Sequence, residues 1–321
     1  MTAKLSDPIF HNEDAARAHF EALRWPDGRV CPHCGTVDNS VLLKGKSTRP
    51  GLYKCRDCRK PFTATLGTVY EKSHIPLHKW LLATHLMCAS KKGISATQLH
   101  RELGFGSYRT AWFMAHRIRE AMRPAGASEP MGGEGKTVEA DETYYGKVAK
   151  PRMQTRDRGA FKGSRMGRGP ANKNAVISLV ERGGKVRSFH VDTANRATVE
   201  KIVAENIAKE TRLHTDESHL YAKSKVPTLV AKHETVRHSA DEYVRGDVHS
   251  NSVEGFFSVF KRGMRGVYQK CDEKHLHRYL AEYDFRFNHR AALGVNDTER
   301  TDAAITGTVG KRLTYHQTNG R

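Results

Sequence analysis

The sequence contains no long apolar run. No stretch of the 321 residues approaches the roughly 20 consecutive apolar residues that a membrane-spanning helix requires. The first residues, Met-Thr-Ala-Lys-Leu-Ser-Asp-Pro, lack the apolar segment of a secretory signal. Internal repeats are also missing. We therefore expect no membrane partner, a cytoplasmic location and a domain architecture without repeats.

Acidic side chains are scarce relative to basic ones. The chain has 54 Lys and Arg against 35 Asp and Glu, so its formal net charge is +19 and its isoelectric point is near 9.8. A positive charge of this size predicts a polyanionic partner, and nucleic acid is the first candidate. Within a cytoplasm, such a protein is expected to associate with the nucleoid.

Cysteine is scarce too, and its spacing is informative. Four of the six cysteines form two Cys-x-x-Cys pairs, at Cys31 and Cys34 and at Cys55 and Cys58. In a chain without a secretory signal this pattern favours metal ligation over disulfides. Two such pairs predict a zinc ribbon in which four thiolates hold one structural Zn²⁺. Zinc binding would supply much of the folding energy of so small a module.

The residues after the ribbon are predicted to be helical. A first short helix precedes the ribbon at residues 12–24, and the segment 77–122 has helical spacing of its apolar residues. Within it, a helix from Ser95, a Gly-containing turn and a helix from Ser107 have the layout of a helix-turn-helix. Arg109 and Arg117 are its candidate DNA contacts. An ordinary helical hairpin is the alternative interpretation.

Strands follow a Gly- and Pro-rich linker at residues 124–135. Residues 137–145, 174–180, 185–191, 213–218 and 233–238 are predicted strands, and residues 198–209 are a predicted helix. The segment 147–173 is a basic, glycine-rich insertion that we expect to become ordered on a phosphate backbone. Its candidate DNA contacts are Lys162, Arg165 and Arg168.

A helix with Asn251 or Ser252 as its candidate N-cap carries one unusual acid. Glu254 has Phe257 and Ser258 at the positions where a helical salt-bridge partner would stand, so its carboxylate needs another partner, such as a metal ion. Lys261 and Arg265 share its face. They are either solvated or in contact with DNA. A last helix is predicted at 274–288, and the residues from 296 onward are polar enough to predict a frayed tail.

Three acids are placed so that carboxylates distant in sequence would come together beyond the ends of the strands. Asp141 and Asp216 end two predicted strands, and Glu254 lies on the following helix. Three carboxylates can hold two Mg²⁺ or Mn²⁺ ions for in-line phosphodiester displacement. The spacing leaves alternatives open, which are Glu139 or Glu142 in place of Asp141 and Glu217 in place of Asp216.

Five segments resemble the DDE transposases of bacterial insertion sequences, in the IS1595 group related to eukaryotic Merlin elements. The matching segments are 24–34 (Arg-Trp-Pro-Asp-Gly-Arg-Val-Cys-Pro-His-Cys), 139–144 (Glu-Ala-Asp-Glu-Thr-Tyr), 215–218, 249–258 and 276–288. The resemblance covers roughly residues 12–290. It implies an RNase H-like core with Asp141, Asp216 and Glu254 as the metal-binding triad. Because members vary at the third acid, His249 and Asn251 are alternatives or auxiliaries to Glu254.

The expected fold is therefore multidomain α/β with an RNase H-like mixed-sheet catalytic core. The expected domains are the zinc ribbon with its preceding helix (1–70), the helix-turn-helix-like region (71–128), the catalytic core with its basic insertion (129–295) and a polar tail (296–321).

The expected function is a transposase that binds terminal inverted repeats in double-stranded DNA, hydrolyses strands there and joins the 3′-hydroxyls to target DNA. Pairing two ends implies a homo-oligomer on DNA. The alternatives are a zinc-ribbon DNA-binding regulator, a catalytically dead transposase derivative and a stand-alone nuclease.

Overall fold

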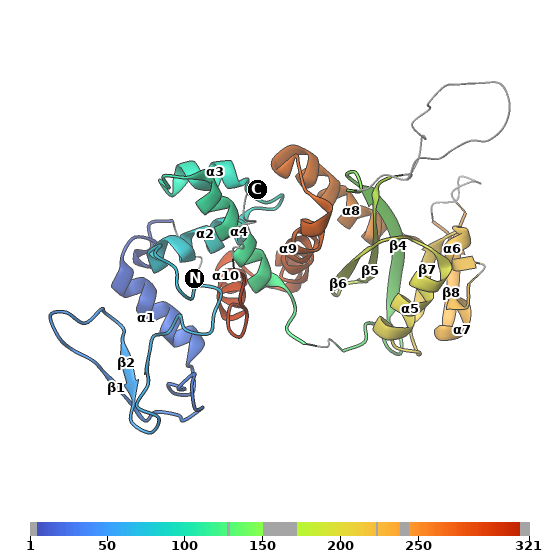
Figure 1. Ribbon diagram of the computed structural model, residues 1–321. Coiled ribbons are helices and arrows are strands. Elements are labelled where there is room, and N and C mark those ends of the chain that lie inside the picture. Colours follow the sequence, from blue (N-terminus) through green and yellow to red (C-terminus); the bar gives the residue numbers. More distant parts are fainter. Residues whose placement is uncertain (1–4, 127–128, 150–171, 223, 238–243, 315–321) are drawn as a thin grey trace. The chain divides into compact units, whose positions relative to one another are not determined.

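The chain folds into two compact units. The computed structural model describes residues 5–126, 129–149, 172–222, 224–237 and 244–314. A helical unit is assembled from residues 1–125 and 289–321, and a sheet unit from residues 126–288 (Figure 1). The boundary lies within the linker predicted from composition. In the described ranges, no helix is both long and apolar enough to cross a membrane.

A three-stranded antiparallel sheet forms the ribbon of the helical unit. Its strands are β1 (Ser40–Leu42), β2 (Tyr53–Cys55) and β3 (Pro61–Phe62), in that order. Tyr53 and Phe62 are buried with Trp25 against the cysteines. This apolar cluster is small, as expected for a module that depends on a metal for its stability.

Four helices of this unit begin where polar side chains satisfy free backbone amides. The helices are α1 (Glu13–Arg24), α2 (Leu77–Ala89), α3 (Ala96–Glu102) and α4 (Tyr108–Met122), and a short 3-10 helix, η1 (Pro8–Phe10), precedes them. Asn12, Ser95 and Ser107 cap α1, α3 and α4, which confirms the predicted starts. The start of α2 has no such cap, and Glu13 of α1 accepts hydrogen bonds from the amides of Leu77 (2.9 Å) and His78 (3.1 Å) instead.

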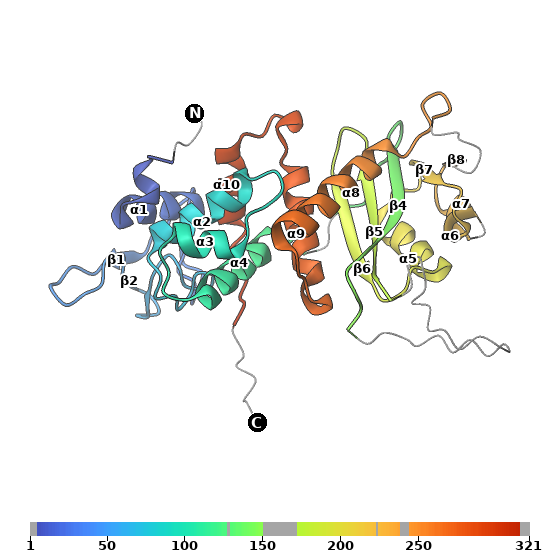
Figure 2. The same cartoon turned by 90° about the horizontal axis from the view of Figure 1, so that it is seen from above.

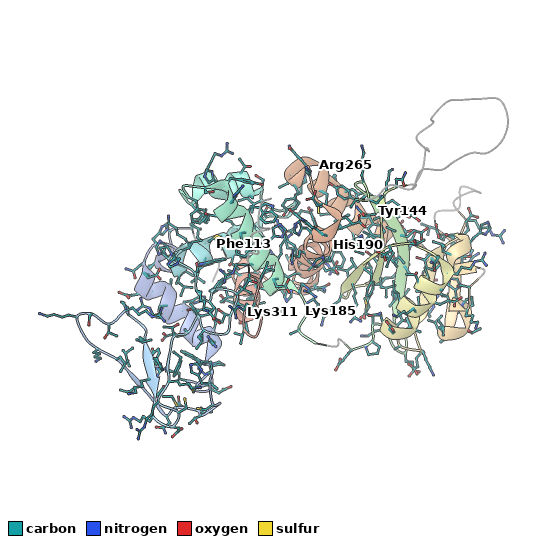
Figure 3. All side chains as sticks on the ribbon, in the orientation of Figure 1. Phe113, Tyr144, Lys185, His190, Arg265 and Lys311 are labelled. Carbon is teal, nitrogen blue, oxygen red and sulfur yellow. The ribbon has the colours of Figure 1, made fainter. Side chains whose placement is uncertain are left out.

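The predicted polar tail is wrong for residues 297–306. They form α10 (Asp297–Thr306), which follows η5 (Ala291–Leu293) and begins with a capping box between Asn296 and Glu299. Ala304 and Ile305 are buried, and α10 packs against α1, α2 and α4. Farther on, Lys311 donates to the carbonyl of Ala121 on α4 (2.8 Å; Figure 3). The average polarity of residues 296–321 concealed the apolar helix face that carries Ala304 and Ile305, and it concealed the capping signal of Asn296 and Glu299. Residues 315–321 lie outside the described residues.

A five-stranded mixed sheet is the centre of the sheet unit. Its strands are β4 (Thr137–Tyr145), β5 (Asn174–Glu181), β6 (Val186–Val191), β7 (Arg212–Asp216) and β8 (Lys232–Val236). The order is β6-β5-β4-β7-β8, with β4, β5 and β6 antiparallel and with β4, β7 and β8 parallel. This is the strand order of an RNase H-like fold. All five strands confirm the sequence prediction within a few residues.

Helices cover both faces of this sheet (Figures 1 and 2). One face packs against α5 (Arg196–Asn206), α6 (His219–Ala222) and α7 (Val226–Leu229) through Val138, Ala140, Leu213 and their neighbours. The other face packs against α8 (Asn251–Gly263) and α9 (Leu276–Asn288) through Val176, Val180 and Val186. The short helices η3 (Met264–Tyr268) and η4 (Glu273–His275) connect α8 to α9. The result is a three-layer α/β/α unit.

We predict that the helical unit requires α10. A chain truncated after Val295 should lose at least about 3 kcal/mol of unfolding free energy, because removing a buried aliphatic side chain such as Ile305 alone costs about 2–5 kcal/mol. Thermal unfolding followed by tryptophan fluorescence measures this, since Trp25, Trp80 and Trp112, the three tryptophans, all lie in this unit. Truncation after Thr314 is the control. Equal stability of both truncated chains would show that α10 is dispensable.

Candidate functional site

The site begins where two parallel strands separate. β4 pairs with β7 from Thr137 opposite Arg212 to Glu139 opposite His214, and the pairing then ends. The chain winds from β4 through β5 and β6 to one side, and returns through α5 to β7 on the other. Such a reversal is a topological switch point, and α/β sheets bind ligands beyond the carboxyl ends of the strands at such a point.

Three carboxylates meet at these strand ends. Asp141 and Asp216 each stand two residues beyond the last β4–β7 pair, and Glu142 follows Asp141. One carboxylate oxygen from each of the three lies within 4.8 Å of the others. Oxygen donors grouped in this way suit a hard divalent cation such as Mg²⁺. Both predicted strand-end acids are therefore brought together, and Glu142 joins them.

The electrostatics of this group favour a cation. Burial, together with the charges of Glu142 and Asp216, raises the pKa of Asp141 to about 8. Burial likewise raises the pKa of Glu142, with a further contribution from Asp216. Part-buried carboxylates that lie close together repel one another when ionised, so they hold protons unless a cation neutralises them. This acid group therefore fits the divalent metal ion that was inferred from the sequence.

Glu254 approaches the group from a different element. It is exposed in the first turn of α8, and its oxygens lie outside the 4.8 Å group that contains Asp141, Glu142 and Asp216. Its charge still contributes to the raised pKa of Asp141. The hydroxyl of Ser250 donates to the Glu254 carboxylate at 2.6 Å, which orients it.

The alternation of side chains along β4 separates the candidate acids. Val138 and Ala140 belong to the core on the α5 face, so Glu142 also points to that side, and Ser218 Oγ lies 3.5 Å from its carboxylate. Glu139 and Asp141 point to the α8 face, where the amides of α8 bind Glu139. The α8 face therefore carries Asp141 and Glu254, whereas Glu142 approaches Asp141 and Asp216 from the α5 face.

The start of α8 differs from the prediction. The helix begins at Asn251, and the capping position belongs to Ser250, whose side chain makes no capping hydrogen bond. Neither Asn251 nor Ser252 is therefore the N-cap. His249 Nδ1 accepts from the guanidinium of Arg182 at 3.0 Å and lies 3.3 Å from Glu139, and the side chain of Asn251 is exposed. His249 thus has partners other than the three grouped acids.

The four paired cysteines also come together. Cys31 Sγ lies 3.7 Å from Cys58 Sγ, and Cys34 Sγ lies 3.6 Å from Cys55 Sγ. All four sulfurs lie within 4.8 Å of one another. A tetrahedral zinc site with Zn–S bonds of about 2.3 Å requires sulfurs about 3.8 Å apart. Gly35, which follows the first pair, has φ +79°, a left-handed backbone conformation that favours glycine.

Two family models and one known relative match the chain. Residues 132–288 match the ISXO2-like transposase domain, and residues 11–61 match the transposase zinc-ribbon domain. The "uncharacterized protein in transposable element ISH50" of Halobacterium salinarum is 32% identical over 288 residues, which cover 86% of this chain and 91% of that protein. The chain belongs to the IS1595 family of DDE transposases.

A solved structure is also similar, but distantly. A chain of the cryo-EM structure of the simian T-cell lymphotropic virus intasome, in complex with PP2A regulatory subunit B56 gamma, shares 14% identity with the transposase. The match covers 58% of this chain and 67% of that chain, with a TM-score of 0.29. The strand order and the family identify the RNase H-like fold.

The predicted DNA contacts of the transposase have different surroundings. Arg109 is exposed in the first turn of α4, Lys261 is half-buried on α8, and Arg265 is exposed in η3 (Figure 3). Lys162, Arg165 and Arg168, with most of the predicted basic insertion, lie outside the described residues.

The surroundings of Arg117 contradict its predicted contact with DNA. It is 8% exposed, donates to the carbonyl of Glu71 at 2.8 Å and lies over the ring of Trp80. A buried guanidinium with these partners packs the core of the helical unit, so the predicted DNA contact is wrong. The helical spacing alone could not distinguish this position from Arg109, because an arginine stem packs on apolar surface as readily as it extends into solvent.

Sequence reasoning missed two residues that structure the site. Arg182, in the turn between β5 and β6, donates to Glu139 and to His249, and Ser250 donates to Glu254. Arg182 lies outside the five segments that resemble the family, whereas Ser250 lies within one of them, 249–258. The available signal was Glu139 itself, because a charged residue at an interior position of a strand requires a buried partner.

We predict that metal affinity depends on pH through Asp141. Since its pKa is raised to about 8, the carboxyl mostly holds a proton below pH 8, and a cation must displace it. Mn²⁺ affinity should therefore fall about tenfold for each pH unit from 8 to 6 and level off above 8. Isothermal titration at these pH values measures the slope, which Asp141→Asn should flatten. A flat wild-type profile would contradict the raised pKa.

We predict that the ribbon holds one zinc ion in each chain. Cys55→Ser should lose that zinc and unfold the ribbon, because zinc contributes about 10–16 kcal/mol to such modules. Elemental analysis of the purified protein measures the metal. Cys271→Ser, outside the four-sulfur group, is the control and should retain it. Zinc retained by Cys55→Ser in full stoichiometry would exclude the four-thiolate site.

Proposed function

We propose that the chain is an Mg²⁺-dependent DNA transposase. It would bind the terminal inverted repeats of its insertion sequence, hydrolyse strands at the ends and join the freed 3′-hydroxyls to target DNA. The observation that carries this proposal is the pair of acids Asp141 and Asp216, held in register at the ends of parallel strands in a chain of the DDE transposase family.

Asp141, Asp216 and Glu254 are the proposed metal ligands, with two ions of Mg²⁺ or Mn²⁺ in each site. Two bound cations would polarise the scissile phosphate and lower the pKa of the attacking water or 3′-hydroxyl. Asp141 is proposed as a ligand because it is grouped with Asp216 and Glu142 within 4.8 Å and because the charges of Glu142, Asp216 and Glu254 all raise its pKa. Glu254 is preferred over Glu142 as the third ligand because it shares the α8 face with Asp141.

The proposed role of each acid follows from the contacts that fix its position. Asp141 is fixed by the pairing of β4 with β5, and Asp216 is fixed by the pairing of β7 with β8. Glu254 is oriented by Ser250 and exposed, so it is accessible to a phosphodiester that enters from solvent. Glu142 would stay behind the ligands, where Ser218 holds it and its charge keeps the site attractive to cations.

The ribbon and the helix pair are the proposed DNA-recognition surfaces. The ribbon carries seven exposed basic residues, which are Lys44, Lys46, Arg49, Lys54, Arg56, Arg59 and Lys60. Arg109 is exposed where α4 begins, the position from which the second helix of a helix-turn-helix contacts bases. Basic side chains in this number would neutralise phosphates, and affinity for DNA should fall steeply with salt. Because two element ends must be joined together, we propose that the active form on DNA is a homo-oligomer.

A cleavage and joining assay tests this function. A plasmid carrying the DNA that flanks the gene is incubated with the protein and Mg²⁺ or a chelator. We expect Mg²⁺-dependent nicks at the tips of the repeats and joined products. Asp141→Asn and Glu254→Gln should each reduce the rate at least about 100-fold, since a ligand to a catalytic metal contributes several kcal/mol.

Two further variants locate the third ligand. Glu217→Gln, beside Asp216 but outside the three-acid group, is the matched control and should retain activity. Glu142→Gln should reduce the rate less than Glu254→Gln. The reverse order would assign the third ligand to Glu142. Cleavage without joining indicates a nuclease, and repeat binding without cleavage indicates a regulator or an inactive derivative.

A further inference from the structure

A fully buried carboxylate connects β4 to the helix that carries Glu254. Glu139 is 0% exposed and lies two residues before Asp141 on the same face of the strand. Its Oε2 accepts hydrogen bonds from the amides of Ser252 (2.7 Å) and Val253 (3.1 Å), the second and third residues of α8. Its Oε1 accepts from the hydroxyl of Ser252 at 3.0 Å. Glu139 therefore caps a helix that is distant in sequence.

The same carboxylate is neutralised by one arginine. Arg182 Nε donates to Glu139 Oε1 at 2.7 Å. Its other nitrogens donate to the carbonyls of Asp247 (2.6 Å) and His249 (3.0 Å), in the segment that leads into α8, and to Nδ1 of His214 on β7 (3.1 Å). A buried charge requires such a partner. The pair therefore binds β4, β7 and the start of α8 to one another.

The first turn of α8 depends on this external cap. Ser250 occupies the capping position, but its side chain makes no capping hydrogen bond and donates instead to Glu254. A serine at this position ordinarily accepts from the helix amides. Here Glu139 accepts from those amides, which leaves the hydroxyl of Ser250 available to orient the proposed third ligand.

We infer that Glu139 is a positioning residue for the metal site. By capping α8 from the strand that carries Asp141, it sets the position of Glu254 relative to Asp141. This inference rests on the proposed function in one respect, the role of Glu254 as a metal ligand. It removes Glu139 from the candidate ligands, since both of its oxygens are occupied by α8, Arg182 and Ser252.

Glu139→Gln is the sharpest substitution. Glutamine keeps the size of the side chain but offers one oxygen, and its NH₂ group would face either the two helix amides or Arg182 and Ser252 Oγ. Donors would then meet donors, so the first turn of α8 should move away. Loss of such a partner behind a metal ligand typically lowers metal affinity roughly 10–100-fold.

A double-mutant cycle on Mn²⁺ affinity tests the inference with the full-length protein. Glu139→Gln, Glu254→Gln and the double variant are titrated with Mn²⁺ alone. If Glu139 acts through Glu254, we expect about a 10–100-fold loss in Glu139→Gln and almost no further loss when it is added to Glu254→Gln. Independent, multiplicative losses would overturn the inference, because a general structural role would weaken the site in both backgrounds.

Hydrogen exchange separates this inference from the proposed function. In Glu139→Gln, exchange should accelerate in residues 249–255 and stay unchanged in α5. If Glu254→Gln binds Mn²⁺ as tightly as the wild type, then Glu254 is not a ligand and the proposed triad fails. The exchange result alone then decides the capping role, and unchanged protection of 249–255 would overturn it.

Two variants keep the test decisive. Asp284→Asn alters another carboxylate of this unit, on α9, that accepts from a backbone amide and a hydroxyl of Ser188, and it should change neither Mn²⁺ affinity nor exchange in 249–255. Where Glu139→Gln does not fold, the same cycle with Glu139→Asp decides, because that variant keeps the charge and both oxygens in the core. Additive losses there would equally overturn the inference.

Discussion

The register between β4 and β7 is the constraint on which the site depends. Glu139 lies opposite His214 at the last pair of the parallel ladder, and Asp141 and Asp216 follow at equal distances. Parallel strands place their carboxyl ends at one edge, so two acids separated by 75 residues in sequence become neighbours. A shift of one residue would turn Asp141 toward the α5 face and bring Glu142 to the α8 face.

The unfavourable electrostatics of this edge are compensated in two ways. Crowding and burial raise the pKa of Asp141, and a divalent cation would relieve that repulsion when bound. Two residues earlier on the same strand, Glu139 is buried at no such cost because Arg182 and the first amides of α8 bind it. Neighbouring carboxylates of one strand thus have opposite roles, one open to a ligand and one closed by the fold.

The helical unit combines segments from both ends of the chain. Zinc ligation would stabilise the ribbon, whereas α10 closes the helical part by packing on α1, α2 and α4. Glu13 capping α2 repeats the device seen at α8, a carboxylate from another element that satisfies free helix amides. Both units therefore use acids for structure in a chain whose basic residues outnumber its acids by 54 to 35.

Local signals in the sequence determined most of this protein. The paired cysteines, the caps at Asn12, Ser95 and Ser107, the five strands and the strand-end acids Asp141 and Asp216 were all predictable, because each depends on neighbours within a few residues. Only the tertiary structure decided the burial of Arg117, the packing of α10, the approach of Glu142 to the two strand-end acids and the capping of α8 by Glu139. Those outcomes depend on distant partners, such as Glu71 for Arg117, Ser252 for Glu139 and His85 for Thr301. Local periodicity carries no information about which distant side chain a given face will meet.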